Sequence, residues 1–518
     1  MRLSGRLPWL AMFAYCVGVH ILMLRISCPG CPTSVLAAEQ AGFTDITETS
    51  GVAALVDDQY AAHPQWWLSG LHLVDLDTDG NLDLFLSTHG RGPALAVLGD
   101  GAGRFARAAG DYPSSEIHLA YDSDEDGKVD LTMTHQDGGG QWWHNRSRPG
   151  RLDFRATGIT RGTNTARRQA MIDINRDGHA DWLRGTGRGI LFDFGNGRGG
   201  FVSNSRMLAV AAGRAEVLCL PQDVDGDGDM DLLTEWGHYE NANGTSRILC
   251  NDGRMHFADV TAAAGLPQEA LSIKGTGDVD QDGDPDLICL KRRQTFAIYL
   301  NDGSGHFTEK AGAVRGVEKG AAMASWGIAV TTDFDNDGLA DILANGKHFL
   351  KILRGVGGGS FQYMNAVWDI RDLSASSVDD GLCFGDFDND GDLDIVGYAS
   401  IDGQRRIAVY RNDLPARNWL RVRPVGRAGN RPAAGAIIRV CEPATGRLLW
   451  REQVAIYDSQ SASSYYAAAQ TERHFGLGSR THVDVSVEFY PSGAVVWKRG
   501  GRGGQTLAVE EPEETPGP

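Results

Sequence analysis

Aspartate recurs in this chain in a nine-residue pattern, Asp-x-Asp/Asn-x-Asp-Gly-x-x-Asp, which occurs seven times. In each copy, oxygen-bearing side chains at positions 1, 3, 5 and 9 surround a glycine at position 6. Calcium is a hard cation that takes about six to eight oxygen ligands. A loop can supply several of them when a glycine allows the backbone to turn sharply. The pattern therefore predicts one Ca²⁺ site in each copy and up to seven in the chain.

The predicted metal ligands occupy positions 1, 3, 5 and 9 of each loop. Six loops are complete, and the third has Asn175 in place of its second carboxylate, so we expect it to bind most weakly. The residues are, loop by loop: Asp75, Asp77, Asp79 and Asp83; Asp122, Asp124, Asp126 and Asp130; Asp173, Asn175, Asp177 and Asp181; Asp223, Asp225, Asp227 and Asp231; Asp278, Asp280, Asp282 and Asp286; Asp333, Asp335, Asp337 and Asp341; Asp386, Asp388, Asp390 and Asp394.

An EF-hand begins with similar residues, but its loop ends in a bidentate glutamate at position 12. Position 12 is never glutamate here; it is Leu86, Met133, Arg184, Thr234, Cys289, Ala344 or Gly397. The loops run instead into short apolar stretches such as 82–86 and 394–396, which are typical of β-strands. The EF-hand interpretation is therefore rejected.

The loops begin 47 to 55 residues apart, and such a period indicates one supersecondary unit repeated along the chain. Each unit contains apolar stretches before and after the loop, then a third stretch such as 295–301, and a fourth that begins at an aromatic residue such as Phe307. Four strands per repeat are typical of a β-propeller blade. We predict an all-β chain containing a seven-bladed β-propeller, and 67 glycines among 518 residues suit such a turn-rich fold.

The seventh repeat lacks its fourth strand, because the chain leaves the third strand near Tyr410 without a segment like 257–261. A matching segment, Phe-Thr-Asp-Ile-Thr, stands at residues 43–47. We predict that this N-terminal strand completes the last blade. Closure of this kind removes an exposed sheet edge.

Together the loops and their strands resemble the FG-GAP or VCBS propeller repeats of integrin α-subunits and many bacterial secreted proteins. The C-terminal segments 430–440, His-Phe-Gly-Leu-Gly at 474–478 and 485–493 are similar to the ASPIC/UnbV domain that follows such propellers in the cartilage acidic protein family. One departure is Ala468-Ala469, where a Ser-Gln pair is usual. The resemblance implies a calcium-binding propeller at residues 39–413 and an ASPIC/UnbV-like domain, rich in β-strands, at 418–510.

The N-terminus combines Arg2 and Arg6 with an apolar run over residues 7–24 and small residues near 35–38. This arrangement predicts a signal peptide at residues 1–38, and so a secreted protein that is extracellular or periplasmic. An uncleaved membrane anchor is the alternative. Residues 511–518 are predicted to be a disordered tail.

The net charge is −18, and the loops alone contain 27 carboxylates. The acidity is therefore explained mainly by metal-site chemistry, and no stripe of Lys or Arg indicates a nucleic-acid partner. Five cysteines follow the predicted signal peptide. They are interpreted as buried structural thiols rather than disulfides, with Cys219 and Cys250 the first pair to check.

The predicted function is that of an extracellular binding or adhesion module for a protein or glycan, with calcium in a structural role. We expect no enzymatic activity, because His118, His135, His238 and His474 lie in no recognisable catalytic motif. The alternatives are a propeller-based enzyme of the polysaccharide lyase or hydrolase kind and an assembly scaffold. Trp66-Trp67 and Trp142-Trp143 could stack on sugars, but one ring in the core and one at a rim is the favoured interpretation.

Overall fold

The computed structural model describes residues 42–513 except for short segments at 89–91, 111, 113–115, 135–139, 158–167, 187–188, 203–205, 210–215, 238–245, 268–270, 292–294, 318–328, 347–348, 366–367, 369–381, 402–403 and 459–471. The predicted signal peptide and Ala468-Ala469 lie outside the described residues. The described residues belong to one compact unit, 41–518.

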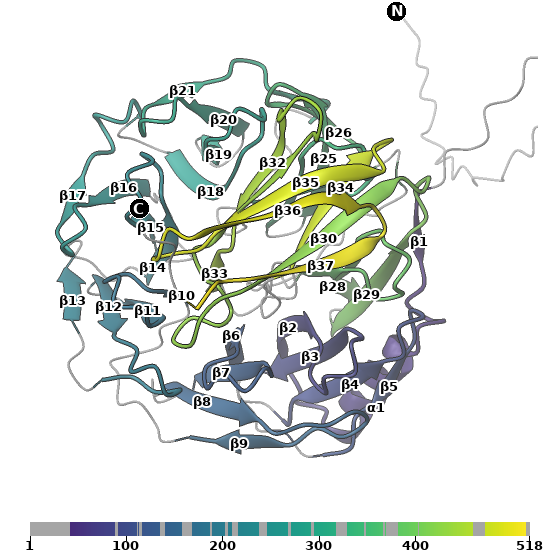
Figure 1. Cartoon of the computed structure of the whole chain (residues 1–518). Coiled ribbons are helices and arrows are strands. Elements are labelled where there is room, and N and C mark those ends of the chain that lie inside the picture. The colour runs from purple at the N-terminus through teal and green to yellow at the C-terminus, as the bar shows by residue number, and fades with distance from the viewer. Residues whose placement is uncertain are drawn as a thin grey trace, which may run out of the picture. The chain divides into compact units, whose positions relative to one another are not determined.

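Small antiparallel sheets that follow one another around a ring make up most of the chain (Figure 1). We number seven of them by the acidic loop that each contains, and each loop joins the first and second strands of its sheet. The first four consist of β2 (Leu68–Val74), β3 (Asp83–Thr88), β4 (Leu95–Gly99) and β5 (Phe105–Arg107); β6 (Glu116–Tyr121), β7 (Asp130–Thr134), β8 (Gly140–Asn145) and β9 (Phe154–Ala156); β10 (Arg168–Ile172), β11 (Asp181–Thr186), β12 (Gly189–Asp193) and β13 (Arg206–Ala209); β14 (Glu216–Gln222), β15 (Asp231–Gly237), β16 (Ser246–Asn251) and β17 (Phe257–Asp259).

Sheets five to seven repeat this plan. They consist of β18 (Leu271–Gly277), β19 (Asp286–Lys291), β20 (Thr295–Asn301) and β21 (Phe307–Glu309); β23 (Ala329–Thr332), β24 (Asp341–Gly346), β25 (Phe349–Gly357) and β26 (Ser360–Tyr363), with the short β22 (Val314–Arg315) parallel to β26; β27 (Leu382–Gly385), β28 (Asp394–Ile401) and β29 (Gln404–Asn412), with β1 (Phe43–Asp45). The chain is a β-propeller, as predicted.

The N-terminal strand β1 closes the ring. Phe43 pairs with Asn412 and Asp45 with Tyr410, so β1 forms the outer strand of sheet seven, which confirms the prediction for this segment. The pairing extends beyond the strand, since Ile46 N–H donates to Val409 O at 2.9 Å. The two ends of the repeat array are thereby joined within one sheet.

A single α-helix, α1 (Val52–Ala62), is present in the described part of the chain, and the repeat pattern gives no sign of it. Val52 and Val56 lie one turn apart on one face of the helix and are fully buried. They pack into the core formed by β2, β3 and β4. No helix among the described residues is long and apolar enough to cross a membrane.

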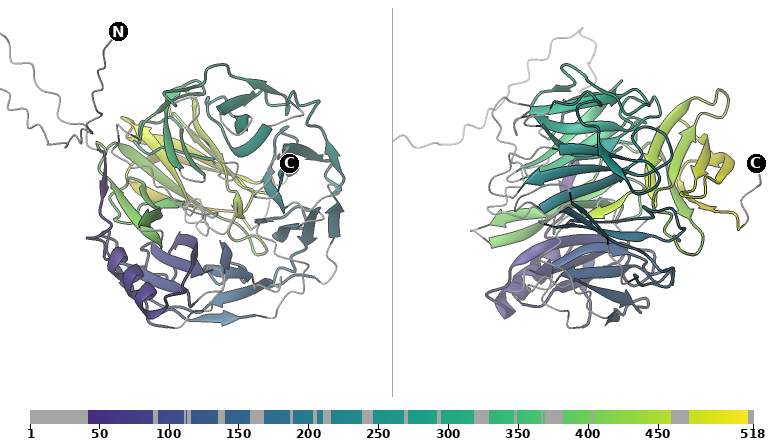
Figure 2. Two further views of the ribbon diagram at one scale, coloured as in Figure 1. Left: turned by 180° about the vertical axis from the view of Figure 1, so that it is seen from behind. Right: turned by 90° about the vertical axis from the view of Figure 1, so that its left-hand side faces the viewer.

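The C-terminal segment forms two further sheets, with their own apolar core. One contains β30 (Asn418–Val425), β34 (Arg473–Gly478) and β37 (Gln505–Glu510), and the other contains β31 (Ile437–Cys441), β32 (Leu448–Gln453), β35 (His482–Glu488) and β36 (Val495–Arg502). Figure 2 shows these strands over one face of the ring. The short β33 (Ile456–Asp458) leaves them and pairs with β10, so that it becomes a fifth strand of sheet three.

Candidate metal sites and the C-terminal interface

The acidic loops share a backbone that curls each loop around its own first aspartate. In loop five, the Asp278 carboxylate accepts the N–H groups of Asp282 and Gly283, both at 3.1 Å. Gly283 has a φ of 105°, a conformation that costs glycine little. Position 4 is also left-handed in every loop, and only loop four has glycine there. The side chains of positions 1, 3 and 5 therefore converge instead of alternating as in a strand.

The ninth-position aspartate of each loop is fully buried and ties the loop to the third strand. In loop five, Asp286 Oδ2 accepts Val279 N–H at 2.9 Å, and its Oδ1 accepts Asn301 N–H at 2.8 Å. The same pair of bonds is made by Asp83, Asp130, Asp181, Asp231, Asp341 and Asp394. This residue therefore has a structural role in addition to any role as a ligand.

The third-position carboxylates show whether the loops fit a cation. One oxygen, Oδ1, is buried without a hydrogen-bond partner in four loops, at Asp124, Asp280, Asp335 and Asp388. A buried carboxylate oxygen without a partner is costly unless a cation compensates it. These oxygens are hard donors, as Ca²⁺ requires. In loop one, oxygens of Asp75, Asp77 and Asp83 lie within 4.8 Å of one another, so these residues could hold a metal ion.

Burial also makes the loops electrostatically strained without a cation. It raises the pKa of Asp278 to about 7 and that of Asp286 to about 8, with neighbouring aspartates adding to both shifts. In loop two, burial raises the pKa of Asp122 to about 7. A bound cation would oppose these shifts, because it favours the ionised carboxylate.

The predicted ligands all lie within the seven described loops, and the structure brings three of them within 4.8 Å of one another in loops such as one, two and four. Other predicted residues are placed as follows. His118 lies in β6, whereas His135 and His238 lie outside the described residues. The tryptophan pairs follow the favoured interpretation: Trp66 and Trp142 are buried, Trp67 is exposed and Trp143 is half-buried.

All five described cysteines are free thiols, so Cys219 and Cys250 are not joined, which confirms the expectation from the sequence. Cys250 lies against the Asp225 and Asp231 carboxylates of loop four. Burial, followed by these negative charges, raises its pKa, so this thiol stays protonated.

Asparagines at the end of the third strands are structural residues that the sequence pattern did not reveal. Asn145 Nδ2 donates to Leu76 O of the preceding sheet at 2.8 Å. Asn301 bonds Val224 O and Asn412 bonds Phe334 O in the same way, each at 2.8 Å. All three acceptors are the second residue of the preceding loop. The available signal was the Asn-Asp pair, which occurs at Asn301 and Asn412 but not at Asn145.

The C-terminal sheets contact loop six through β34 and loop seven through β30. His474 Nε2 lies 2.6 Å from Asn336 Oδ1. Because an amide oxygen only accepts, Nε2 carries the proton. Burial lowers the pKa of His474 to about 3, so the ring is neutral and anchors β34 to loop six. A side chain at Gly476 would collide with Asp333, so only glycine permits this approach.

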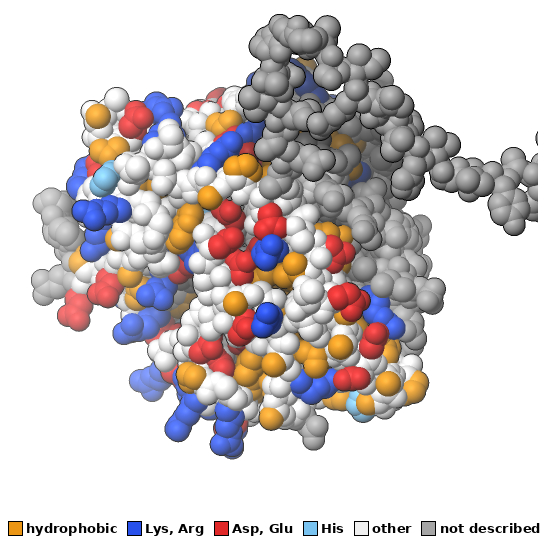
Figure 3. Space-filling model, turned by 90° about the vertical axis from the view of Figure 1, so that its right-hand side faces the viewer, with side chains coloured by type: hydrophobic (Ala, Val, Ile, Leu, Met, Phe, Trp, Pro, Cys, Tyr) orange, Lys and Arg blue, Asp and Glu red, His pale blue; other side chains and the backbone are white. Residues whose placement is uncertain are grey.

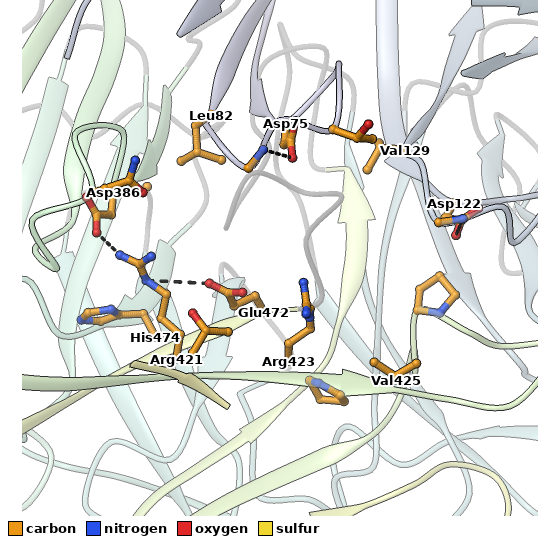
Figure 4. Close-up of a pocket in the computed structure, with 18 of the residues that line it drawn as sticks. Asp75, Leu82, Asp122, Val129, Asp386, Arg421, Arg423, Val425, Glu472 and His474 are labelled. Carbon is orange, nitrogen blue, oxygen red and sulfur yellow. Dashed lines mark hydrogen bonds and ion pairs between the residues drawn. The ribbon is translucent and has the colours of Figure 1, made fainter. Parts of the chain in front are cut away.

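A cavity of about 520 Å³ lies between the C-terminal strands and loops one, two and seven. Its walls include Asp75, Asp122 and Asp386 from the loops, and Arg421 and Arg423 from β30 (Figure 4). Arg421 contacts Asp386 and lies 3.8 Å from Glu472, whereas Arg423 points into the cavity. The cavity therefore presents charges of both signs.

Comparison with known protein families identifies both parts of the chain. The family model for the FG-GAP-like repeat matches residues 122–184, 278–344 and 333–397, and the model for the ASPIC and UnbV domain matches residues 426–516. The fold and loops thus define an FG-GAP repeat β-propeller. More particularly, the chain is an FG-GAP repeat protein with a C-terminal ASPIC and UnbV domain.

No curated protein matches the chain. Among solved structures, it is similar to an Agrocybe aegerita lectin that recognises non-reducing terminal N-acetylglucosamine, with 19% identity, a TM-score of 0.43 and coverage of 67% of this chain and 90% of the lectin. It is also similar to the Photorhabdus luminescens Tc holotoxin pore, with 12% identity, a TM-score of 0.35 and coverage of 81% of this chain and 22% of the pore chain. A third similar structure is Saccharomyces cerevisiae Sqt1, with 13% identity, a TM-score of 0.36 and coverage of 66% of this chain and 83% of Sqt1.

Proposed function

We propose that this protein is a secreted, calcium-stabilised β-propeller that acts as an extracellular binding or adhesion module for a protein or glycan partner. Up to seven Ca²⁺ ions are held by the acidic loops, one in each. The calcium is structural, since all the side chains that would hold an ion come from one loop and its sheet. The unpartnered third-position oxygens support this assignment.

The cavity beneath the C-terminal strands is the observation that carries the binding role. Arg423 and Arg431 line it and are exposed, so they are available to an acidic group on a protein or glycan. By contrast, Arg421 and His474 already contact Asp386 and Asn336. This distribution supports the proposed role in binding.

Charges of both signs are interspersed on the face shown in Figure 3. This distribution supports a protein or glycan partner rather than nucleic acid, which requires a basic surface. The protein would associate with a membrane only if the N-terminal segment is retained as an anchor.

The test is a screen of acidic glycans and extracellular proteins with the purified chain in millimolar calcium. Arg423→Glu should weaken binding of a captured partner at least about tenfold, equivalent to about 1.4 kcal/mol. Arg502→Glu is the matched control, because Arg502 is exposed on β36, outside the cavity. Equal losses in both variants, or unchanged binding by Arg423→Glu, would reject the cavity as the partner site.

A further inference from the structure

One position at or just after the third strand can be matched from sheet to sheet, and its residue type differs among the seven sheets. We call it the third-strand neighbour: it immediately precedes the residue whose N–H donates to the ninth-position aspartate. From sheet one to sheet seven it is Leu98, His144, Phe194, Cys250, Leu300, Arg354 and Arg411.

In loop six this neighbour is an arginine that binds the predicted metal ligands directly. Arg354 Nε donates to Asp335 Oδ2 at 2.6 Å, and its Nη2 contacts Asp337 Oδ2. A second guanidinium joins it: Arg417 Nη1 lies 3.3 Å from Asp335 Oδ2 and donates to Asp335 O at 3.1 Å. The arginines therefore contact Oδ2 of Asp335 and Asp337 and compensate the negative charge of both carboxylates, although Asp335 Oδ1 has no hydrogen-bond partner of its own.

Loop five provides the comparison, because the same position is apolar there. Leu300 precedes Asn301 as Arg354 precedes Gly355, and both following N–H groups bind the ninth-position aspartate. No arginine is bonded to Asp280 or Asp282 among the described residues. Loop five thus retains its charge for an ion, whereas two guanidinium groups bring to loop six the same charge as one Ca²⁺.

Burial distinguishes loop six from loop two, which also contacts an arginine. Arg146 bonds Asp124 at 2.7 Å and Asp126 at 2.5 Å, but its side chain is 46% exposed. Exposed pairs of this kind contribute little and open readily to water. In loop six the side chains of Asp335 and Arg354 are 9% and 29% exposed, and that of the second arginine, Arg417, is 37% exposed. The Arg354–Asp335 pair is therefore partly buried, and removing one partner should cost more there than at the exposed Arg146.

Loop six is also one of several loops that contact the C-terminal domain, with loops two, three, five and seven. His474 contacts Asn336, and Gly478 N–H donates to Asn336 O at 2.9 Å. Arg417 directly precedes β30, the first C-terminal strand. Arg354 and Arg417 therefore stabilise the conformation of a loop that the C-terminal domain contacts.

We propose that Arg354 and Arg417 close loop six in place of a metal ion, so that docking of the C-terminal domain on this loop is independent of calcium. This inference rests on the proposed binding of calcium by the other loops, and it lowers the proposed maximum from seven ions to six. An arginine at this position acts in this way only where it reaches the loop, since Arg411 at the same position in sheet seven bonds Asp413 instead.

Matched substitutions at position 3 test the proposal by counting calcium ions per chain after equilibration in saturating calcium. Asp280→Asn in loop five should lose one ion, and Asp335→Asn in loop six should lose none. Loss of one ion in both variants would overturn the proposal while leaving calcium binding intact. A wild-type chain without calcium would overturn both the proposal and the calcium assignment.

Exchange of the third-strand neighbours gives the reciprocal test. Leu300→Arg should remove one ion from the chain, and Arg354→Leu combined with Arg417→Gln should add one. Hydrogen exchange of the wild-type chain needs no variant: on chelation, amides of residues 278–286 should exchange faster while those of 333–341 stay protected. Equal loss of protection in both loops would contradict closure by arginine.

Discussion

At the scale of single residues, the ninth-position aspartates both fix the loop backbone and are destabilised as buried charges. Each lies inside the sheet with both oxygens accepting backbone N–H groups, as Asp83 does from Leu76 and Gly99. Such bonds favour the charged form, yet burial outweighs them and raises the pKa of Asp83 to about 8. The folded, metal-free chain therefore holds these protons more tightly than the unfolded chain does.

The sign of the resulting pH dependence follows from linkage. Between the unfolded pKa near 4 and the folded pKa of about 8, the folded state binds more protons, so stability falls as pH rises. Each such group contributes at most about 1.4 kcal/mol per pH unit in this window. We expect the melting temperature of the metal-free protein to decrease from pH 5 to pH 8.

Calorimetry on protein depleted of metal by dialysis provides the measurement. The calcium-loaded protein is the control and should show a much flatter profile, because the ion stabilises the ionised carboxylates. A melting temperature of the metal-free protein that rises over this range would contradict the assignment.

Asn175 is the second residue-scale case, since it replaces a carboxylate in loop three and donates to Asp177 Oδ2 at 3.0 Å. Asn175→Asp should tighten the weakest calcium site about tenfold, because ligand charge tunes such sites. Calcium titration by calorimetry measures this change. The control is Asn389→Asp, which adds the same charge at an exposed position that is not a predicted ligand. If this variant raised the calcium affinity by the same factor, the effect of Asn175→Asp would be one of general charge only.

At the scale of elements, neighbouring sheets are joined by side-chain bonds as well as by packing. Asn301, at the end of β20, donates to Val224 O of sheet four and to Pro285 O of its own sheet. Its Oδ1 also accepts Gly303 N–H at 3.2 Å. One asparagine thereby fixes its own turn and the preceding loop.

Asn301→Ala should lower the free energy of unfolding by about 1–3 kcal/mol, because it leaves buried carbonyl groups without a donor. Asn251→Ala is the matched control: Asn251 occupies the same position in sheet four, but among the described residues its amide donates only to Met230 O, at 3.3 Å within that sheet. Denaturant unfolding should show the larger loss for Asn301→Ala. An equal loss would mean that the bond between sheets adds nothing.

The ring is held at the scale of the whole molecule by β1 in sheet seven and by β33 in sheet three. Segments distant in sequence thus complete single sheets. We predict that the propeller has seven blades. Electron-microscopy averages viewed down the ring should show seven radial densities, and six or eight would refute the count.

Chelation is the prediction for the molecule as a whole. Extracellular calcium loops commonly have dissociation constants of about 10⁻⁴–10⁻³ M. At millimolar calcium each site then contributes about 0.4–1.4 kcal/mol by mass action, and several sites together contribute several kcal/mol. Excess EGTA should therefore lower the melting temperature substantially, and added calcium should restore it. An unchanged melting temperature, with no calcium by elemental analysis, would identify the loops as acidic turns only.

The limits of the C-terminal domain remain a prediction at this scale. Limited proteolysis should cut between residues 413 and 418 and release the C-terminal part. Leu414 is buried and Arg417 contacts Asp335, so cleavage should be slow relative to that of a free linker. Cleavage confined to the repeats would count against the boundary.

The sequence by itself determined the local architecture, because each loop and its strands depend on residues close together in the chain. The Asp and Gly spacing predicted the loops, the strands around them and the propeller, and the Phe43 segment predicted closure of the ring. Tertiary structure alone decided what faces each loop. Arg354 and Arg417 reach Asp335 from positions 19 and 82 residues away, and His474 reaches Asn336 across 138 residues. No periodic pattern records such contacts, since they depend on how sheets and domains pack against one another.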